Sequence, residues 1–210
     1  ISKICVIPAL LRKKFYDAKK ADSIDKYINL LVIGGSQGAK IFDTLIKSSI
    51  IKLSKRYSLK IYQQTNLINF EELKIFYKDN NINYELFDFH EDISNFMSRS
   101  NICLTRAGAS TLAELVFLNL PCVAIPLPTS KDNHQFENAF FYKKIGCNWI
   151  LNQNDIDDDT ILNKLANIID NKDEYLAKKI NMKNFNYQNT WNNINQKIIS
   201  VINENRISKN

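Results

Sequence analysis

Short, continuous runs of apolar residues recur along the chain, followed by polar or glycine-containing turns and then by helical patterns. Such runs are typical of strands that are buried on both faces, as in a parallel sheet covered by helices. We therefore expect strands at Ile28–Ile33, Leu59–Gln63, Asn83–Phe87, Ile102–Thr105, Cys122–Ile125 and Trp149–Leu151. The pattern predicts the α/β class, with a doubly wound, Rossmann-like parallel sheet of about six strands whose ligands bind beyond the carboxyl ends of the strands.

Helical periodicity fills the segments between these runs and continues towards the C-terminus. Helices are predicted at Gly38–Arg56, Phe70–Asn80, Asp92–Ser98, Ala109–Asn119, Asn133–Ile145 and Asp157–Ile169, with a helical tail from Glu174 to about Asn205. The charged segment ahead of the first strand has no strand period, and we interpret it as an interdomain linker. The expected division is a linker over residues 1–27, a ligand-binding domain over residues 28–170 and C-terminal helices over residues 171–210.

Composition narrows the class of protein. The 210 residues suit one α/β domain, and no apolar run approaches the roughly 18 to 20 residues needed to span a bilayer. The four cysteines (Cys5, Cys103, Cys122 and Cys147) form no C-x-x-C pair, so we expect no zinc site and interpret them as buried thiols in a reducing compartment. The net charge of +6 suits a phosphorylated substrate, an anionic lipid or nucleic acid, but the lysines are scattered, which favours a generally solvated basic surface.

The first predicted strand runs directly into a glycine-rich segment, residues 34–40, with the sequence Gly-Gly-Ser-Gln-Gly-Ala-Lys. Glycines let the backbone approach a ligand, and the free amides of a helix start favour phosphate, although a tight turn without a ligand explains such a loop equally well. A Walker A loop is excluded because alanine follows Gly38 where lysine is required. NAD is disfavoured because the second strand ends in Tyr62-Gln63-Gln64, without the acidic residue that holds the ribose.

A second loop of small residues, Arg106-Ala107-Gly108-Ala109-Ser110-Thr111, follows the fourth predicted strand and opens a helix. The first amides of this helix are free to bind a phosphate. Glu114 lies one to two turns further along, where a carboxylate can accept hydrogen bonds from the vicinal hydroxyls of a ribose. The pairing indicates a nucleotide site. The alternative is that Ser110 and Glu114 only satisfy and complement the helix start.

A third loop follows the fifth predicted strand and brings His134, Gln135 and Asn138 to the start of a helix. Gln135 and Asn138 are three residues apart and therefore lie close together on one helix face. His134 taken alone is more often a surface or capping residue. Three loops at the carboxyl ends of the first, fourth and fifth strands predict a binding site more strongly than any one of them.

The acidic run Asp157-Asp158-Asp159 could be mistaken for a D-x-D metal site. It precedes a helical pattern, and aspartates are favoured at and before helix starts. We interpret the run as a capping cluster and expect no metal site.

These loops resemble, in order and spacing, the C-terminal domain of the bacterial N-acetylglucosaminyltransferases of glycosyltransferase family 28, which convert lipid I to lipid II in peptidoglycan synthesis. The resemblance is carried by Ile33–Lys40, Arg106–Glu114, Leu120-Pro121 and Asp132–Ala139. The combination of G-G-S-Q-G-A with R-x-G-A-x-T-x-x-E is quite specific. It implies one half of a GT-B fold, in which two Rossmann-like domains face each other and the C-terminal one holds UDP-N-acetylglucosamine.

The residues that the resemblance implies as substrate-binding come from the linker, the loops and two helix starts. They are Arg12, Gly35, Ser36, Gln37, Gly38, His90, Gly108, Ala109, Ser110, Thr111, Leu112, Ala113, Glu114, His134, Gln135 and Asn138. By this resemblance Ser36 contacts the diphosphate or sugar region, Glu114 and the turn before it bind phosphate and ribose, and Gln135 contacts the sugar. His90 occupies the position whose backbone reads the uracil, and Arg12 resembles an arginine of the interdomain segment.

The resemblance also implies what else the chain needs. The N-terminal domain of the family, with the acceptor pocket and the catalytic base, has no counterpart in this sequence, so we expect no transfer without it. The implied partners are UDP-N-acetylglucosamine and, through the missing domain, an undecaprenyl-linked acceptor, with peripheral contact at the inner face of the cytoplasmic membrane, no cofactor and no nucleic acid. Two alternatives stay open: a separate donor-binding subunit of a two-part transferase, and a basic nucleic-acid-binding domain.

Overall fold

The computed structural model describes residues 9–34, 40–88, 92–157, 159–186 and 189–207. Its strands are β1 (Ile28–Ile33), β2 (Leu59–Gln64), β3 (Asn83–Phe87), β4 (Ile102–Thr105), β5 (Cys122–Ala124) and β6 (Asn148–Ile150). They form one parallel sheet in the order β3-β2-β1-β4-β5-β6, which confirms the predicted Rossmann-like fold. Because the order reverses between β1 and β4, the fold predicts that ligands bind in a crevice beyond the carboxyl ends of these two strands.

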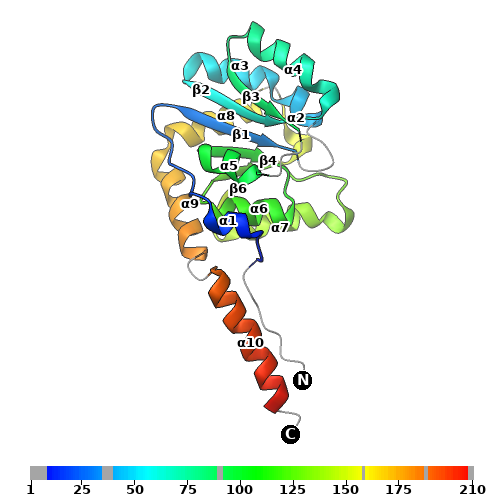
Figure 1. The fold of residues 1–210 in the computed structure, drawn as a ribbon. Helices are drawn as coiled ribbons and strands as arrows, with labels where there is room; N and C mark the ends of the chain where they lie inside the picture. Colours follow the sequence, from blue (N-terminus) through cyan, green and yellow to red (C-terminus); the bar gives the residue numbers. More distant parts are fainter. Residues whose placement is uncertain (1–8, 35–39, 89–91, 158, 187–188, 208–210) are drawn as a thin grey trace.

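Helices cover both faces of the sheet (Figure 1). One layer contains α1 (Lys13–Asp17), α5 (Ile93–Arg99), α6 (Ala109–Phe117) and α7 (His134–Lys144); the other contains α2 (Lys40–Leu45), α3 (Lys47–Arg56), α4 (Leu67–Asp79) and α8 (Thr160–Asp170). Alternate residues of β1 face the two layers: Leu31 packs with the first and Leu30 with the second. Both residues are fully buried, which explains why the strand reads as a continuous apolar run.

Two predicted helices are each divided in the structure, while α4 begins three residues earlier than predicted and α8 three residues later. The helix predicted over residues 38–56 is divided at Ile46 into α2 and α3. The C-terminal tail is two helices, α9 (Lys172–Phe185) and α10 (Trp191–Ile207), because Asn186 ends α9 and the Thr190 hydroxyl accepts a hydrogen bond from the backbone of Asn193 at the start of α10. Figure 1 shows α10 extending away from the body of the molecule.

The described part of the linker, residues 9–27, packs against the domain along its length. Leu11, Phe15 and Ala21 are buried in the core beneath α1 and α6. The ammonium of Lys179, on α9, donates to the carbonyl oxygens of Ala21 at 2.8 Å and Asn119 at 2.9 Å, and more weakly to that of Asp22. The second half of the linker is therefore fixed to α9 and to the turn after α6.

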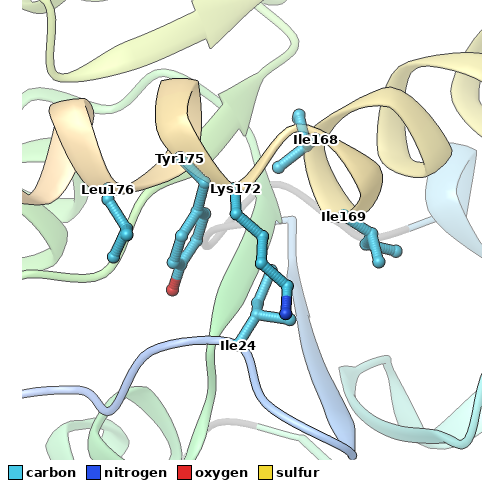
Figure 2. Close-up of a pocket in the computed structure, with 6 residues that line it drawn as sticks. All are labelled: Ile24, Ile168, Ile169, Lys172, Tyr175 and Leu176. Atoms are coloured by element: carbon cyan, nitrogen blue, oxygen red, sulfur yellow. The ribbon is translucent and has the colours of Figure 1, made fainter.

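A small cavity lies where α8 and α9 meet the linker (Figure 2), and it is lined by Ile24, Ile168, Ile169, Lys172, Tyr175 and Leu176. Its volume of about 40 Å³ has room for little more than a water molecule. The Tyr175 hydroxyl donates to the carbonyl of Asn101, just before β4, which places the cavity near the amino ends of the strands. The cavity is therefore distinct from the crevice at the carboxyl ends.

The predicted buried thiols are confirmed for Cys103, Cys122 and Cys147, which are free and buried, while Cys5 lies outside the described residues. Burial raises the pKa of Cys122 to about 12 and that of Cys147 to about 11. Thiols held protonated in this way are poor nucleophiles. None of the described helices combines the length and the apolar composition needed to cross a bilayer.

Candidate functional site

The predicted site residues of the described chain gather at the carboxyl ends of β4 and β5, beside the end of β1. The backbone N–H of Arg106 donates to the carbonyl of Ile33 at 3.3 Å, which joins the end of β1 to the loop after β4. Five of the predicted residues lie outside the described part of the chain: Gly35, Ser36, Gln37, Gly38 and His90. The site is therefore described from the linker, the start of α6 and the start of α7.

The start of α6 presents backbone amides rather than side chains. Gly108 is the N-cap of α6. Because glycine has no side chain, no side-chain group caps the helix start. Its φ of −65° suits any residue, and a Cβ there would meet nothing closer than Thr111 Oγ1 at 3.7 Å. Neither backbone conformation nor internal packing thus requires this glycine, whereas close approach of a ligand to the helix start would.

Within the first turns of α6, the predicted residues separate into two groups. Ala109 and Ser110 are exposed and Thr111 is half-buried, so their backbone amides, which have no partner within the helix, can face a ligand. Leu112 and Ala113 are buried in the core, and the N–H of Leu112 is already bonded to the carbonyl of Gly108. The helix start therefore offers three amides and the positive end of its dipole, an arrangement that suits a phosphate.

Glu114 lies one turn further and is buried, with only 10% of its side chain exposed. Its Oε1 accepts a hydrogen bond from Arg12 Nη2 at 3.0 Å, and the carboxylate has no other side-chain partner among the described residues. Burial raises the pKa of Glu114, while the nearby charges of Arg12 and Lys14 oppose the rise. The structure thus brings together two predicted site residues that are far apart in sequence, and it leaves Oε2 available.

Gln135 and Asn138 connect the start of α7 to the two neighbouring loops. Gln135 Oε1 accepts from the backbone N–H groups of Leu127 at 3.0 Å and Ala107 at 3.3 Å. Asn138 Nδ2 donates to the carbonyl of Ala107 at 3.1 Å. With its oxygen committed to two backbone donors, Gln135 keeps its Nε2 donor group for a ligand, since no described residue accepts from it.

The residues just before α7 hold an unusual backbone conformation. Asp132 and Asn133, within the single turn η1 (Lys131–Asn133), have φ values of 50° and 55°. Left-handed conformations are uncommon for residues other than glycine, although Asn and Asp tolerate them best. The exposed His134 follows, and its Nδ1 lies 2.6 Å from the carbonyl of Lys131. His134 therefore closes this turn, while Gln135 and Asn138 tie it to the site.

Arg106 also lies beside these residues, although it was not among the predicted substrate-binding residues. It is buried, its Nη1 donates to the carbonyl of Ile125 at 3.1 Å, and its guanidinium lies 5.4 Å from the centre of the Phe42 ring. Burial lowers the pKa of this guanidinium. A charged residue directly after an apolar strand was the signal in the sequence. We define the α6–α7 cluster as Arg12, Arg106, Glu114, Gln135 and Asn138.

A second polar cluster at the end of β2 was not predicted. Asp43 is buried, and its carboxylate accepts from Asn69 Nδ2 at 2.7 Å, Gln63 Nε2 at 2.8 Å and Thr65 Oγ1 at 3.0 Å. Tyr77 donates its hydroxyl to Gln63 Oε1, and burial raises the pKa of this tyrosine. We define the β2 cluster as Asp43, Gln63, Thr65, Asn69 and Tyr77. It fixes α2 and α4 to the carboxyl end of β2.

Within the acidic run before α8, Asp157 bonds to the start of the helix, whereas the N-cap residue Asp159 makes no side-chain cap bond. Asp157 Oδ1 accepts from the backbone N–H groups of Thr160 at 2.7 Å and Asp159 at 3.1 Å, and Asp158 lies outside the described residues. The bonds from Thr160 are the main reason that the pKa of Asp157 is lowered. The carboxylate is thus engaged in the local backbone, as expected of a residue just before a helix.

Comparisons of the sequence with known proteins agree on one family. The family model described as Glycosyltransferase family 28 C-terminal domain matches residues 29–194. A curated protein of Pelagibacter ubique (strain HTCC1062), the UDP-N-acetylglucosamine--N-acetylmuramyl-(pentapeptide) pyrophosphoryl-undecaprenol N-acetylglucosamine transferase, is 67% identical over 204 residues, which cover 97% of this chain and 57% of that protein. The transferase of the same name from Rickettsia bellii (strain RML369-C) is 38% identical over 156 residues, which cover 73% of this chain and 44% of that protein.

A solved structure, that of Acinetobacter baumannii MurG, matches with a TM-score of 0.71 at 25% sequence identity. The match covers 93% of this chain and 53% of that one. The chain therefore spans about half the length of the proteins that it matches in sequence and in structure.

Proposed function

The chain belongs to the family of glycosyltransferase family 28 C-terminal domains, and from this membership we propose that it is the donor-binding half of an N-acetylglucosaminyltransferase. In this proposal it holds UDP-N-acetylglucosamine for transfer to an undecaprenyl-linked muramoyl-pentapeptide, the acceptor named in the curated relatives. The transferring enzyme acts at the cytoplasmic face of the membrane. The chain spans about half the length of these relatives, and in this proposal the acceptor site and the catalytic base belong to the part that it does not span, so the 210 residues bind the donor without transferring its sugar.

One observation carries the proposal: the first three amides of α6, which have no partner within the helix, lie about one turn from a buried carboxylate whose Oε2 has no partner among the described residues. The amides suit a phosphate of the donor. Glu114 can accept hydrogen bonds from the two ribose hydroxyls. Gln135, with its free Nε2, stands at the neighbouring helix start, where it can donate to an oxygen of the sugar. A phosphate site beside a diol acceptor selects a nucleotide over an inorganic anion.

The proposed reaction is a displacement at the anomeric carbon with inversion. The acceptor hydroxyl forms a new bond to this carbon and gives its proton to the catalytic base, while the bond to the diphosphate breaks and UDP leaves with the bonding electrons. Negative charge grows on the diphosphate as the bond breaks, and helix-start amides that are already oriented stabilise it without reorganisation. By the family resemblance, the glycine-rich segment over residues 34–38 is expected to add further amides, and Ser36 a contact with the diphosphate or sugar region.

Donor binding to the 210-residue chain tests the proposal. Calorimetric titrations with UDP-N-acetylglucosamine, UDP-glucose and NAD, side by side, are expected to show that the first binds most tightly and that NAD does not bind. Glu114→Ala should weaken binding of the first ligand by about tenfold, because charge-assisted hydrogen bonds contribute about 1.5 to 3 kcal/mol. Equal affinity in the variant and the native chain would remove Glu114 from the site.

Two other functions are less well supported. A separate donor-binding subunit is not favoured, because the curated relatives carry the matching region within one longer chain. A nucleic-acid-binding domain would use the net charge of +6, and it predicts binding that weakens steeply with salt and is displaced by DNA but not by UDP. Displacement by UDP in the same titration separates the two classes.

A further inference from the structure

Arg12 and Glu114 form an ion pair that joins the linker to the proposed nucleotide site. Arg12 Nη2 lies 3.0 Å from Glu114 Oε1, and the two residues are 102 positions apart in the sequence. The arginine side chain is 50% exposed, whereas the carboxylate is the buried partner at 10%. The guanidinium also lies 5.0 Å from the centre of the Phe15 ring, which is fully buried. Arg12 is therefore held from two sides, by a carboxylate and by an aromatic face.

The protonation of Glu114 decides what it can offer to a ribose. An ionised carboxylate accepts hydrogen bonds at both oxygens, whereas a protonated one must use an oxygen as a donor. Burial favours the protonated form of Glu114, and Arg12, followed by Lys14, favours the ionised form. Among the described residues, Arg12 and Lys14 are the charged groups that lower the pKa of Glu114.

We propose that Arg12 is a positioning residue that acts through Glu114: it keeps the carboxylate ionised, holds Oε1 towards the linker and leaves Oε2 directed to the ribose hydroxyls. This inference depends on the proposed nucleotide-sugar site. It assigns to Arg12 a role other than direct contact with the donor, which the family resemblance implied. The two roles differ in their consequences, because direct contact with a phosphate acts equally on UDP and 2′-deoxy-UDP, whereas action through Glu114 depends on the ribose hydroxyls and on the protonation of the carboxylate.

The test measures the affinity of the 210-residue chain for UDP and for 2′-deoxy-UDP between pH 5.5 and pH 8.5, in the native chain and in Arg12→Met. In the native chain we expect UDP to bind about tenfold more tightly than its deoxy analogue above the pH at which Glu114 ionises. In Arg12→Met this preference should persist at pH 8.5 and fall towards onefold at pH 6, because Glu114 then takes up a proton at a higher pH than in the native chain.

Three variants complete the design. Arg12→Lys keeps the positive charge and should keep a pH profile close to that of the native chain. Glu114→Gln cannot ionise, so its low preference for UDP should not change with pH. Lys13→Met removes an exposed charge from the same short helix and should behave as the native chain does. Thermal unfolding of each variant at both pH values establishes that the folded protein is being compared.

The outcomes separate the inference from the function on which it depends. If Arg12→Met weakens UDP and 2′-deoxy-UDP by the same factor at every pH, Arg12 contacts the donor directly and the inference is wrong, while the nucleotide site stands. If Arg12→Met leaves both affinities and both pH profiles unchanged, the arginine has no role in the site and the inference is again wrong. If the native chain binds neither nucleotide, the proposed function and the inference are both overturned.

Discussion

The β2 cluster and the α6–α7 cluster lie at the same edge of the sheet, but they use their hydrogen-bonding groups differently. In the β2 cluster, the Asp43 carboxylate accepts from three side chains, and Gln63 uses both ends of its amide within the cluster. In the α6–α7 cluster, Glu114 Oε2 and Gln135 Nε2 have no partner among the described residues. The first cluster is complete without a ligand, and the second is not.

This difference indicates whether a polar cluster stabilises the fold or binds a ligand. A buried group without a partner costs roughly 1 to 3 kcal/mol, so a cluster that serves only the fold satisfies all of its members. Neither Glu114 Oε2 nor Gln135 Nε2 is among the buried atoms of the described residues that lack a partner, so these two groups can be offered to a ligand without that cost. The comparison predicts that substitutions in the β2 cluster act mainly on folding, whereas substitutions in the α6–α7 cluster act mainly on donor affinity.

The largest effect is expected from Asp43→Ala. The substitution leaves Gln63, Thr65 and Asn69 without the acceptor that they share, in a site closed to water, so the free energy of unfolding should fall by about 3 to 5 kcal/mol. Urea unfolding followed by circular dichroism measures the change. Asp79→Ala, which removes an exposed carboxylate from α4, is the matched control and should change stability by less than about 0.5 kcal/mol. A loss below about 1 kcal/mol for Asp43→Ala would show that the β2 cluster is not closed.

Glu114→Gln should show the opposite behaviour. Its affinity for UDP should fall by about tenfold, since a neutral amide accepts weaker hydrogen bonds than a carboxylate. Its free energy of unfolding should stay the same or rise slightly, because burial disfavours the native charge. Titration calorimetry and urea unfolding of one preparation measure both quantities. A stability loss with unchanged affinity would place Glu114 among the structural residues instead.

Gln135→Glu separates the two tasks of a single side chain. The new carboxylate can still accept from the backbone N–H groups of Ala107 and Leu127, but it has no Nε2 donor for the sugar. Affinity for UDP-N-acetylglucosamine should therefore fall severalfold more than affinity for UDP, with stability changed by less than about 1 kcal/mol. Gln196→Glu, at an exposed position of α10, controls for the added charge. Equal losses for both ligands would remove the sugar contact from Gln135.

The smallest expected effect is a dependence of stability on pH. Because the folded-state pKa of Glu114 is raised above its unfolded value, the native state binds more protons than the unfolded state between those two values. The stability of the native chain relative to Glu114→Gln should therefore fall as the pH rises through this interval and then level off. Urea unfolding at intervals from pH 4 to pH 8 measures the difference, and a rise over the same interval would contradict the burial argument.

The sequence predicted the sheet well because continuous apolar runs follow directly from burial on both faces. The bounds of β1, β3 and β4 agree with the predicted ones, while β6 begins one residue earlier, at the buried Asn148. The start of β6 could not be predicted from an apolar run because Asn148 is polar. Its side chain is buried by donating to the carbonyl of Ala139 on α7, a contact that the local sequence does not indicate. The break between α9 and α10 was missed although Asn186 and Thr190, both favoured at helix ends, marked it.

The candidate site was predictable where local spacing determines it and not where tertiary contacts do. The start of α6 and the pair Gln135 and Asn138 could be placed by helix geometry alone. By contrast, nothing local indicates that Asp43 meets Gln63 and Thr65, or that Gln135 uses its oxygen on two backbone groups. Such contacts depend on the order of the strands, which a single sequence does not specify.

The contact of Lys179 with three backbone carbonyls sets a limit on where the chain can bend. Residues Ala21 and Asp22 are held by this ammonium, and further upstream Leu11 and Phe15, on either side of Arg12, are buried in the core. A hinge between this domain and any preceding one must therefore lie upstream of Leu11. Arg12 and Glu114 are then on the same side of such a hinge, so their ion pair would persist while the two halves open and close.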